Sequence, residues 1–377
     1  MTRIASETGL EILSENEAFL TEQILTYLGN KRSLLGFIEQ GVLHAKSELK
    51  QDKLSCADIF SGSGIVARFL KQHANFIVAN DLELYSKITN ECYLANLTAE
   101  AKNELKNKLN KLKKEIKSEL ESGFITELYS PKDETNITPS DRVFYTPYNA
   151  RYIDTARAKI ELLDDSLKPF FLAPLLHSAS VHANTSGVFK GFYKNKDRVG
   201  QFGGEGRNAL KRILTPIELK MPVFSNFNVE FEVMQKDANL LANELDKVDL
   251  VYLDPPYNQH PYGSNYFMLN LIAKYERPNE ISKVSGIVKN WNRSVYNKKA
   301  NTAEAFFELI SKLKAKFVLI SFNSEGFISK ESFEKNLKKF GKVELREQRY
   351  NAFRGSRNLK SRNLHVKELL FILEKRS

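Results

Sequence analysis

The sequence is poor in cysteine and histidine and has no long apolar run, and each shortage excludes a class of protein. Only two cysteines, Cys56 and Cys92, and six histidines occur among 377 residues. Because they form no cluster at zinc-ligand spacing, neither a disulfide framework nor a structural metal site is expected. No apolar stretch reaches the roughly 18 to 20 residues of a membrane span. The amino terminus also lacks the basic-then-apolar pattern of a signal peptide, so we expect a cytoplasmic protein without a membrane partner.

Positive charge is what the composition has in excess. Lysine and arginine number 56 against 46 aspartates and glutamates, which gives a net charge of +10. This balance favours a polyanionic partner such as nucleic acid, although many basic proteins bind none. The 377 residues are enough for one large domain, or two of ordinary size, with a buried core.

The residues Asp254-Pro255-Pro256-Tyr257 directly follow an apolar run, residues 248–253, that is typical of a buried strand. In open α/β sheets, ligands bind at the carboxyl ends of the strands. The prolines hold φ at about −65° and disfavour helix before them, which makes the turn stiff. A base amino group could therefore donate to Asp254 and to the Pro255 carbonyl while Tyr257 covers the ring. A proline-rich strand exit without chemistry is the alternative.

A glycine turn forms a second candidate site. Residues 55–60 are typical of a strand, residues 61–64 of a turn, and residues 65–70 of a helix. Gly62 and Gly64 allow close approach of a ligand to the backbone, and the helix amino terminus offers N–H groups to polar or anionic atoms. Such a turn is weak evidence by itself, because many bind no nucleotide.

A second predicted strand, residues 76–81, strengthens this indication. It ends in Asp81, about 20 positions after the glycine turn, where a carboxylate can accept from both ribose hydroxyls. Gly62 and Gly64 are followed by no third glycine near Ala67, so the spacing departs from the dinucleotide fingerprint. The pattern favours an adenosine cofactor over one that carries a pyrophosphate.

The middle of the chain interrupts the alternation of strands and helices. Residues 101–122 predict an amphipathic helix with one apolar stripe and a solvated lysine face, and residues 123–228 are rich in aromatic, polar and basic side chains. We interpret residues 101–228 as an insertion between two parts of one catalytic domain, residues 1–100 and 229–377.

Two segments of the insertion, residues 190–198 and 202–207, interleave cations with aromatic rings. Nucleic-acid surfaces have this character, and a hydrated surface loop is the plain alternative. The candidate DNA contacts in the insertion are Arg198, Arg207, Lys211 and Arg212. Such side chains can touch phosphates or guanine edges equally well, so the bases that they recognise do not follow from the sequence.

Alternation resumes after residue 228. Further strands are predicted at residues 229–234, 248–253, 316–323, 342–350 and 365–373, and helices at residues 238–242, 266–272 and 303–313. The last two strands flank a basic loop, residues 354–362, and lie close enough in sequence to pair antiparallel. The expected fold is α/β, with a mostly parallel sheet that ends in an antiparallel hairpin.

Several ordered motifs carry a family resemblance. Residues 27–31 are similar to the amino-terminal motif X, residues 58–64 to motif I, Asn80-Asp81 to motif II and residues 254–257 to motif IV of the D12-class, Dam-like DNA adenine-N6 methyltransferases. These enzymes use S-adenosylmethionine. The order resembles the α arrangement, in which a target-recognition insertion separates the cofactor half from the catalytic half. The resemblance implies a Rossmann-like class I methyltransferase sheet with residues 101–228 as the target-recognition region.

The resemblance also implies roles for single residues. The catalytic residues would be Asp254, Pro255, Pro256 and Tyr257. S-adenosylmethionine would be bound by Tyr27, Asn30, Lys31, Asp58, Phe60, Gly62, Ser63, Gly64, Asp81 and Asp237. Among these, Lys31 is a candidate for the cofactor carboxylate or the target strand, and Asp237 for the neighbourhood of the cofactor adenine. Phe322 stands where the family often has tyrosine, which leaves its role open.

The implied reaction is a direct methyl transfer to a flipped adenine. The base leaves the duplex because its N6 is unreachable inside the stack. Asp254 and the Pro255 carbonyl accept the two N6 hydrogens, and Tyr257 stacks on the base. Positioning and electrostatics supply the catalysis, so no metal is needed.

Other enzymes share parts of this pattern. N4-cytosine methyltransferases more often begin motif IV with serine, and methyltransferases of RNA adenine or protein glutamine with asparagine. Asp254 therefore favours adenine, and the net charge of +10 with a large insertion favours duplex DNA. A DNA-binding module without catalysis would require neither the Asp254 motif nor the glycine turn.

The expected partner is double-stranded DNA, in a bacterial restriction-modification system whose restriction endonuclease acts separately on the same site. We expect a monomer, since methyl transfer to one strand needs one site. Residues 285–297 follow the catalytic helix and could form a mobile loop over the DNA. Arg293 in this segment is a further candidate DNA contact.

Overall fold

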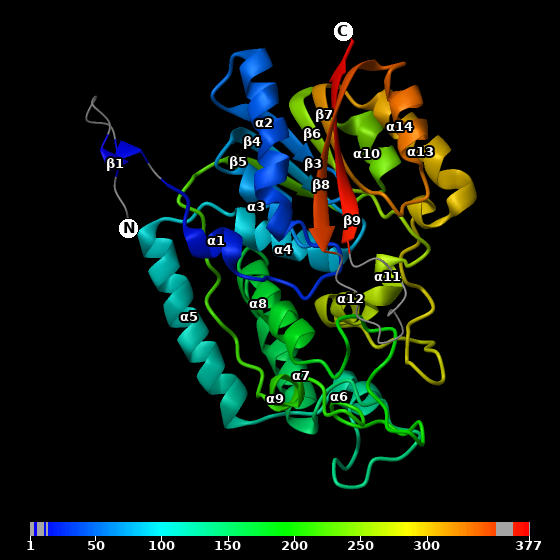
Figure 1. Ribbon diagram of the computed structural model, residues 1–377. Helices are drawn as coiled ribbons and strands as arrows, with labels where there is room; N and C mark the ends of the chain where they lie inside the picture. The colour runs from blue at the N-terminus through cyan, green and yellow to red at the C-terminus, as the bar shows by residue number, and fades with distance from the viewer. Residues whose placement is uncertain (1–3, 6–10, 13, 352–364, 377) are drawn as a thin grey trace.

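A seven-stranded sheet forms the centre of the protein. The computed structural model describes residues 4–5, 11–12, 14–351 and 365–376 (Figure 1). The strand order is β5 (Glu230–Met234), β4 (Ala74–Asn80), β3 (Leu54–Asp58), β6 (Val248–Leu253), β7 (Ala315–Asn323), β9 (His365–Lys375) and β8 (Gly341–Asn351). The predicted basic loop 354–362 lies outside the described residues.

Strand direction divides the sheet into two parts. β5, β4, β3, β6 and β7 pair in parallel, whereas β9 runs antiparallel to both β7 and β8. This confirms the predicted mostly parallel sheet with a terminal antiparallel hairpin. From β3 the chain passes to β4 on one side, whereas β6 pairs on the other side. Such a switch in direction opens a crevice at the carboxyl ends of the central strands.

Helices cover both faces of the sheet. On one face, α2 (Leu35–Leu49) and α3 (Ile65–Leu70) pack against alternate strand residues such as Cys56 and Leu250. On the other face, α10 (Ala238–Glu244), α13 (Lys299–Lys312) and α14 (Lys330–Leu337) pack against Ala57 and Val251. Neighbouring residues of one strand thus enter opposite cores, because side chains alternate along a strand.

A helical region lies below the sheet in Figure 1. It contains α4 (Leu84–Leu94), α5 (Ala99–Ser118), α6 (Phe124–Tyr129), α7 (Pro147–Glu161), α8 (Lys168–Val181), α9 (Leu210–Leu214) and α12 (Phe267–Lys274). Apart from α9, these helices supply buried residues to one hydrophobic core. The part within residues 101–228 shares this core with α4 and α12, which flank it in sequence. The boundaries at residues 101 and 228 stay a prediction.

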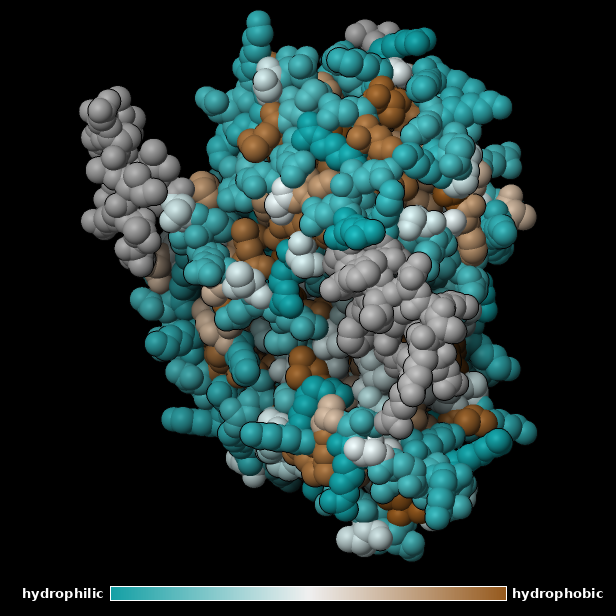
Figure 2. All heavy atoms as spheres, viewed as in Figure 1, coloured by the Kyte–Doolittle hydropathy of each residue, from teal (hydrophilic) through white to brown (hydrophobic). Residues whose placement is uncertain are grey.

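Helix α5 shows how its sequence sets both its start and its orientation. The Thr98 hydroxyl accepts a hydrogen bond of 3.2 Å from the Ala101 amide, which caps the helix. The predicted apolar stripe is buried at Leu105, Leu109, Leu112 and Ile116. The outer side of α5 is hydrophilic, as is most of the face seen in Figure 2. The helix ends at Ser118, four residues before the predicted end at residue 122.

Short elements complete the structure. They are β1 (Ile4–Ala5), β2 (Glu11–Ile12), α1 (Glu17–Thr21), η1 (Arg32–Leu34), α11 (Tyr262–Asn265) and η2 (Val295–Asn297). Strand β3 ends at Asp58, so Ile59 and Phe60, which were predicted in the strand, belong to the turn. Within the described ranges, no helix is both long and apolar enough to span a membrane.

Candidate active site

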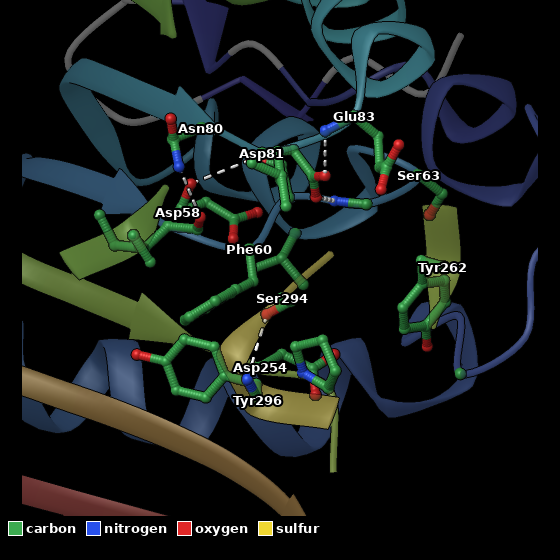
Figure 3. A pocket seen from close by; sticks show the side chains of 18 of the residues that line it. Asp58, Phe60, Ser63, Asn80, Asp81, Glu83, Asp254, Tyr262, Ser294 and Tyr296 are labelled. Atoms are coloured by element: carbon green, nitrogen blue, oxygen red, sulfur yellow. Dashed lines mark hydrogen bonds between the residues drawn. The ribbon is translucent and has the colours of Figure 1, made fainter. Parts of the chain in front are cut away.

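The carboxyl ends of β3, β4 and β6 open into a cavity, whose empty space together with the solvent at its mouth is about 860 Å³. Figure 3 shows Asp58, Asp81 and Glu83 on one side of it and Asp254 and Tyr296 on the other. The predicted site residues that line it are Tyr27, Asn30, Lys31, Asp58, Phe60, Gly62, Ser63, Asp81, Asp237, Asp254 and Pro256. The cavity therefore brings together segments that are more than two hundred residues apart in sequence.

The predicted residues outside that lining are Gly64, Pro255 and Tyr257. Gly64 is the N-cap of α3 and has φ of +75°, and a Cβ there would lie 2.7 Å from Asn90 Oδ1. Pro255 and Tyr257 belong to the same turn as Asp254. The Tyr257 carbonyl accepts a hydrogen bond of 3.1 Å from the Phe327 amide. The Tyr257 ring meets Phe322 edge-on at 6.2 Å between centroids.

Asp81 fastens the glycine turn to the end of β4. Its two carboxylate oxygens accept hydrogen bonds from the backbone amides of Gly62, at 2.8 Å, and Glu83, at 2.9 Å. Burial raises the pKa of Asp81 to about 6, although these amide donors favour the ionised form. Gly62 has φ of +51°, and a Cβ there would lie 2.9 Å from the Tyr27 ring. Glycine is therefore required where the motif X tyrosine packs on the turn.

Asp58 presents a carboxylate oxygen to the cavity. Its Oδ2 accepts a hydrogen bond of 3.1 Å from the Ala67 amide in α3. Its Oδ1 is buried and has no hydrogen-bond partner in the described part of the chain. Burial raises the pKa of Asp58 well above its usual range, and the charges of Asp254 and Asp81 raise it further. An unpaired buried oxygen of this kind suits a ligand that brings a positively charged donor.

Tyrosines form one wall of the cavity. The Tyr27 ring stacks on both Tyr262, at 4.9 Å between centroids, and Tyr266, at 4.8 Å, and these two rings also stack on each other at 6.0 Å. The Tyr262 hydroxyl donates to the Leu28 carbonyl, and the Leu28 amide donates to the Tyr266 hydroxyl. These bonds hold the motif X segment against α11 and α12. The sequence did not single out Tyr262 and Tyr266, because nothing but their aromatic side chains distinguishes them from other residues of this segment.

A further aromatic pair lies near the start of α10. Phe60 meets Tyr296 edge-on at 5.1 Å between centroids, and both residues line the cavity. The Asp237 side chain caps α10 through the Asn239 amide at 2.9 Å. The Tyr296 hydroxyl donates to Asn239 Oδ1 at 2.6 Å. Phe60, Tyr296 and Asp237 thus line the cavity next to the start of α10.

The Asp254 carboxylate is held in an ion cluster. Asp254 Oδ1 lies 3.2 Å from the Lys31 ammonium, and the Asp254 side chain is 19% exposed. Burial raises the pKa of Asp254 to about 6, against the lowering effect of Lys31. The Lys31 ammonium also lies 2.8 Å from Glu368 of β9. The structure thus pairs Lys31 with two carboxylates of the protein, where the sequence had suggested the cofactor carboxylate or the target strand.

Glu83 and Asn292 are two further lining residues that sequence analysis missed. Glu83 is 3% exposed, and burial raises its pKa to about 7. Its carboxylate accepts from the side-chain amides of Asn270 and Asn292, the latter at 3.0 Å. Asn292 also donates to the Leu82 carbonyl at 3.1 Å. The segment that was predicted as a mobile loop is thus fastened to the end of β4, and its mobility stays a prediction.

The candidate DNA contacts differ in exposure. Arg198, Arg207, Lys211 and Arg293 are exposed, and the Arg293 guanidinium lies 4.3 Å from the centroid of the Trp291 ring. Arg212 is half-buried and donates to the backbone carbonyls of Ala183, at 3.0 Å, and Thr185, at 3.1 Å. Its guanidinium is therefore engaged within the fold, and we assign Arg212 a structural role.

The helical region touches the segment that follows the catalytic turn. The Lys190 ammonium lies 3.4 Å from His260 Nδ1, and the Phe189 amide donates to the Asn265 carbonyl at 2.7 Å. Farther along, the Tyr129 hydroxyl donates to the Gly286 carbonyl at 2.8 Å. The predicted insertion is thus bonded to the chain next to the cavity.

Known proteins resemble the chain over most of its length. The Type II methyltransferase M.NlaIII of Neisseria lactamica is 31% identical over 93% of this chain and 99% of its own. The Type II methyltransferase M.CviAII of Paramecium bursaria Chlorella virus 1 is 29% identical over 92% and 97%. Modification methylase StsI of Streptococcus sanguinis is 28% identical over 93% of this chain and 52% of its own.

The family comparison covers the same region. The sequence profile of the D12 class N6 adenine-specific DNA methyltransferases matches residues 27–336, which include all four motifs and the cavity residues from Tyr27 to Asn297. The chain belongs to the D12 class of N6 adenine-specific DNA methyltransferases.

Proposed function

We propose that this DNA methyltransferase transfers the methyl group of S-adenosylmethionine, bound in the cavity, to N6 of an adenine flipped out of double-stranded DNA. The observation that carries the proposal is the position of Asp254. Its carboxylate lies at the end of β6 and lines the same cavity as Asp58, Asp81 and the glycine turn. Asp254 therefore faces a space that is shared by cofactor-binding and catalytic groups.

The residues present fit S-adenosylmethionine. The unpaired Oδ1 of Asp58 suits the amino group of its methionine part. Asp81, at the end of β4, suits the ribose hydroxyls, and the Phe60–Tyr296 pair with Asp237 suits the adenine. When bound, the cofactor supplies an electrophilic methyl group on a sulfonium.

Asp254 would accept a hydrogen bond from the target amino group. Its Oδ1 lies 3.2 Å from the Lys31 ammonium, and Oδ2 is the oxygen that we propose for the target amino group. Oδ2 and the Pro255 carbonyl are thus the two acceptors proposed for the N6 hydrogens. These two hydrogen bonds raise the electron density on N6 and fix the direction from which N6 attacks the methyl group. The ionised carboxylate is required, so activity should fall as the pH drops through about 6, the pKa of Asp254.

Tyr257 is proposed to stack on the flipped base. Its ring is held from the side by Phe322. Stacking on an aromatic ring contributes roughly 1 to 3 kcal/mol per base, comparable with the few kcal/mol that flipping costs. The Tyr257 ring would thus offset the cost of taking adenine out of the duplex.

Residues 101–228 are proposed to recognise the target sequence. Arg198, Arg207 and Lys211 are exposed there, and Arg293 is exposed on the segment beside the cavity. The contact of Lys190 with His260 brings the region next to the catalytic turn. A restriction endonuclease acting on the same site, a monomeric state and a cytoplasmic location stay predictions from the sequence.

The test is direct product analysis. Purified protein is incubated with radiolabelled S-adenosylmethionine and unmethylated bacterial DNA, and the DNA is then digested to nucleosides for mass spectrometry. We expect N6-methyldeoxyadenosine from the wild type and none from Asp254→Ala. If N4-methyldeoxycytidine is found instead, the proposed mechanism stands but the target base is cytosine and not adenine. Unlabelled DNA despite cofactor binding would contradict DNA as the substrate.

A further inference from the structure

The ion cluster beside the catalytic turn contains an acidic residue that belongs to none of the motifs. Glu368 comes from the carboxyl-terminal strand β9 and is 2% exposed. Its Oε1 lies 2.8 Å from the Lys31 ammonium and accepts a hydrogen bond of 2.9 Å from the Ser321 hydroxyl of β7. Lys31 is thus held between Glu368 and Asp254.

The sheet brings these residues together. β7 lies between β6, which Asp254 directly follows, and β9, which carries Glu368. In the register of β7 with β9, Asn323 pairs with Glu368 at the end of β7, next to the catalytic turn. Lys31 reaches this point from the turn before α2 and is 5% exposed. The cluster therefore exists only where the antiparallel hairpin completes the sheet.

Burying a cluster of charges like this one lowers the stability of the fold, so its retention indicates a function. Two carboxylates and one ammonium leave an excess of negative charge, and removing charges from water costs several kcal/mol per ion before pairing offsets it. Burial by itself would lower the pKa of the Lys31 ammonium, but Asp254 and Glu368 raise it well above its usual range. Lys31 thus stays charged.

The position of Lys31 decides which oxygen of Asp254 remains available. The ammonium lies 2.8 Å from Glu368 Oε1 and 3.2 Å from Asp254 Oδ1, so Glu368 holds it on one side while it contacts Oδ1 of Asp254 on the other. Without Glu368, one ammonium would face one carboxylate, and it would move to a position shared between both Asp254 oxygens. Oδ2 would then be a poorer acceptor for an amino group.

We propose that Glu368 is a positioning residue for methyl transfer, which holds the Lys31 ammonium against Oδ1 of Asp254 so that Oδ2 accepts the target amino group. This rests on the proposed function of Asp254. Glu368 would also keep excess negative charge beside the amino group while N6 gains positive charge from the sulfonium. It acts through Lys31 and touches neither cofactor nor base.

The test compares Glu368→Gln with Glu374→Gln. Glu374 lies on the same strand and is ion-paired with Lys316 at 3.1 Å, away from the cavity. We expect Glu368→Gln to lower kcat roughly 10- to 100-fold, as misplacement of reacting groups does, with the cofactor Kd changed less than about twofold. Glu374→Gln should keep wild-type kcat. Equal kcat values in the two variants would overturn the proposal.

The pH profile separates positioning from general destabilisation. The charged or titratable groups around Asp254 are Lys31, Glu368, Asp58, Tyr252, Tyr257 and Tyr262. Glu368 raises the pKa of Asp254, so the acid limb of kcat/KM should move to lower pH in Glu368→Gln. Glu368→Asp keeps the negative charge, so the acid limb of its kcat/KM profile should lie at nearly the same pH as in the wild type. An unmoved limb in Glu368→Gln would contradict the inference.

Two further measurements cover the cases of misfolding and of a wrong substrate. If Glu368→Gln does not fold, Ser321→Ala retains all three charges and removes the hydroxyl that orients Glu368, and a smaller loss of kcat is expected. A double-mutant cycle of Glu368→Gln with Asp254→Asn, measured by thermal unfolding, requires no activity. Coupling between the two sites should appear even if DNA is not the substrate, whereas additivity would overturn the proposed link through Lys31.

Discussion

Charged residues have opposite arrangements in the sheet and in the helical region. At the carboxyl edge of the sheet, the buried Asp58 and Lys31 line one cavity together with Asp254, and the buried Glu368 is ion-paired with Lys31. In the helical region, the candidate cations, such as Arg198, point outward from exposed loops. The first arrangement suits chemistry on one small group, and the second suits contacts along an extended polyanion.

The difference has an energetic consequence. Buried charges interact in a medium of low polarity, so removing one should change rate or affinity by orders of magnitude and in a coupled manner. Exposed charges are screened by salt, and each contributes little. Substitutions at the sheet edge should therefore have far larger effects than substitutions on the loops.

The largest effect is expected at the catalytic carboxylate. Asp254→Asn keeps the shape but removes the ionised acceptor, so single-turnover methylation should slow by about 1,000-fold or more. Asp165→Asn, at an exposed acid of the helical region outside residues 190–198 and 202–207, is the matched control and should methylate at the wild-type rate. If the two variants had similar rates, the contrast between the regions would be wrong.

The second-largest effect is expected on the affinity for the cofactor, when Asp81 is replaced. Asp81→Asn loses the charged acceptor for the ribose, and we expect the Kd for S-adenosylmethionine, measured by calorimetry, to rise roughly 10- to 100-fold. At saturating cofactor, kcat should change little, because Asp81 does not contact the target base. A large fall in kcat with an unchanged Kd would assign Asp81 to catalysis.

Stability should depend on pH through Glu83. Its folded-state pKa of about 7 exceeds its ordinary value of 4.5, so the folded protein binds more protons between these values. The contribution of Glu83 to stability is therefore complete at low pH and is lost as the pH rises through about 7. Relative to Glu83→Gln, the wild type should gain about 2 to 3 kcal/mol in unfolding free energy from pH 8 to pH 4. Parallel curves for the two proteins would show that Glu83 keeps its ordinary pKa.

The smallest effects should come from the exposed arginines. Arg198→Ala should weaken DNA binding roughly threefold to tenfold and reduce its salt dependence by about one counterion, without lowering Tm. Arg293→Ala should likewise raise the KM for DNA more than the Kd for the cofactor.

Arg212→Ala is the matched comparison in the same region. It removes the donor from three backbone carbonyls, those of Val181, Ala183 and Thr185, so Tm should fall while the salt dependence of DNA binding stays the same. An unchanged Tm, together with weaker DNA binding, would return Arg212 to the DNA contacts.

Local signals explain which parts of the site were predictable. The Asp254 turn, the glycine turn and Asp81 each follow a predicted strand directly, so position along the chain was enough to locate them at one sheet edge. Glu83, Asn292, Tyr262 and Glu368 carry no such signal, since each acts through partners distant in sequence. The half-buried position of Arg212 depends on the packing of the carbonyls after α8, which the sequence does not show, and its contact with DNA stays a prediction.

Periodicity and short motifs predicted the seven strands of the central sheet, the edge at which the cavity lies, and the family, because both are properties of neighbouring residues, whereas helices α6, α7, α8 and α9 were not predicted. Only the tertiary structure decided how charges pair. Lys31, Asp254 and Glu368 come from three separate strands or turns, and their ion cluster forms only when β7 and β9 align next to β6. The electrostatic state of the site depends on distance and burial, which the order of residues does not contain.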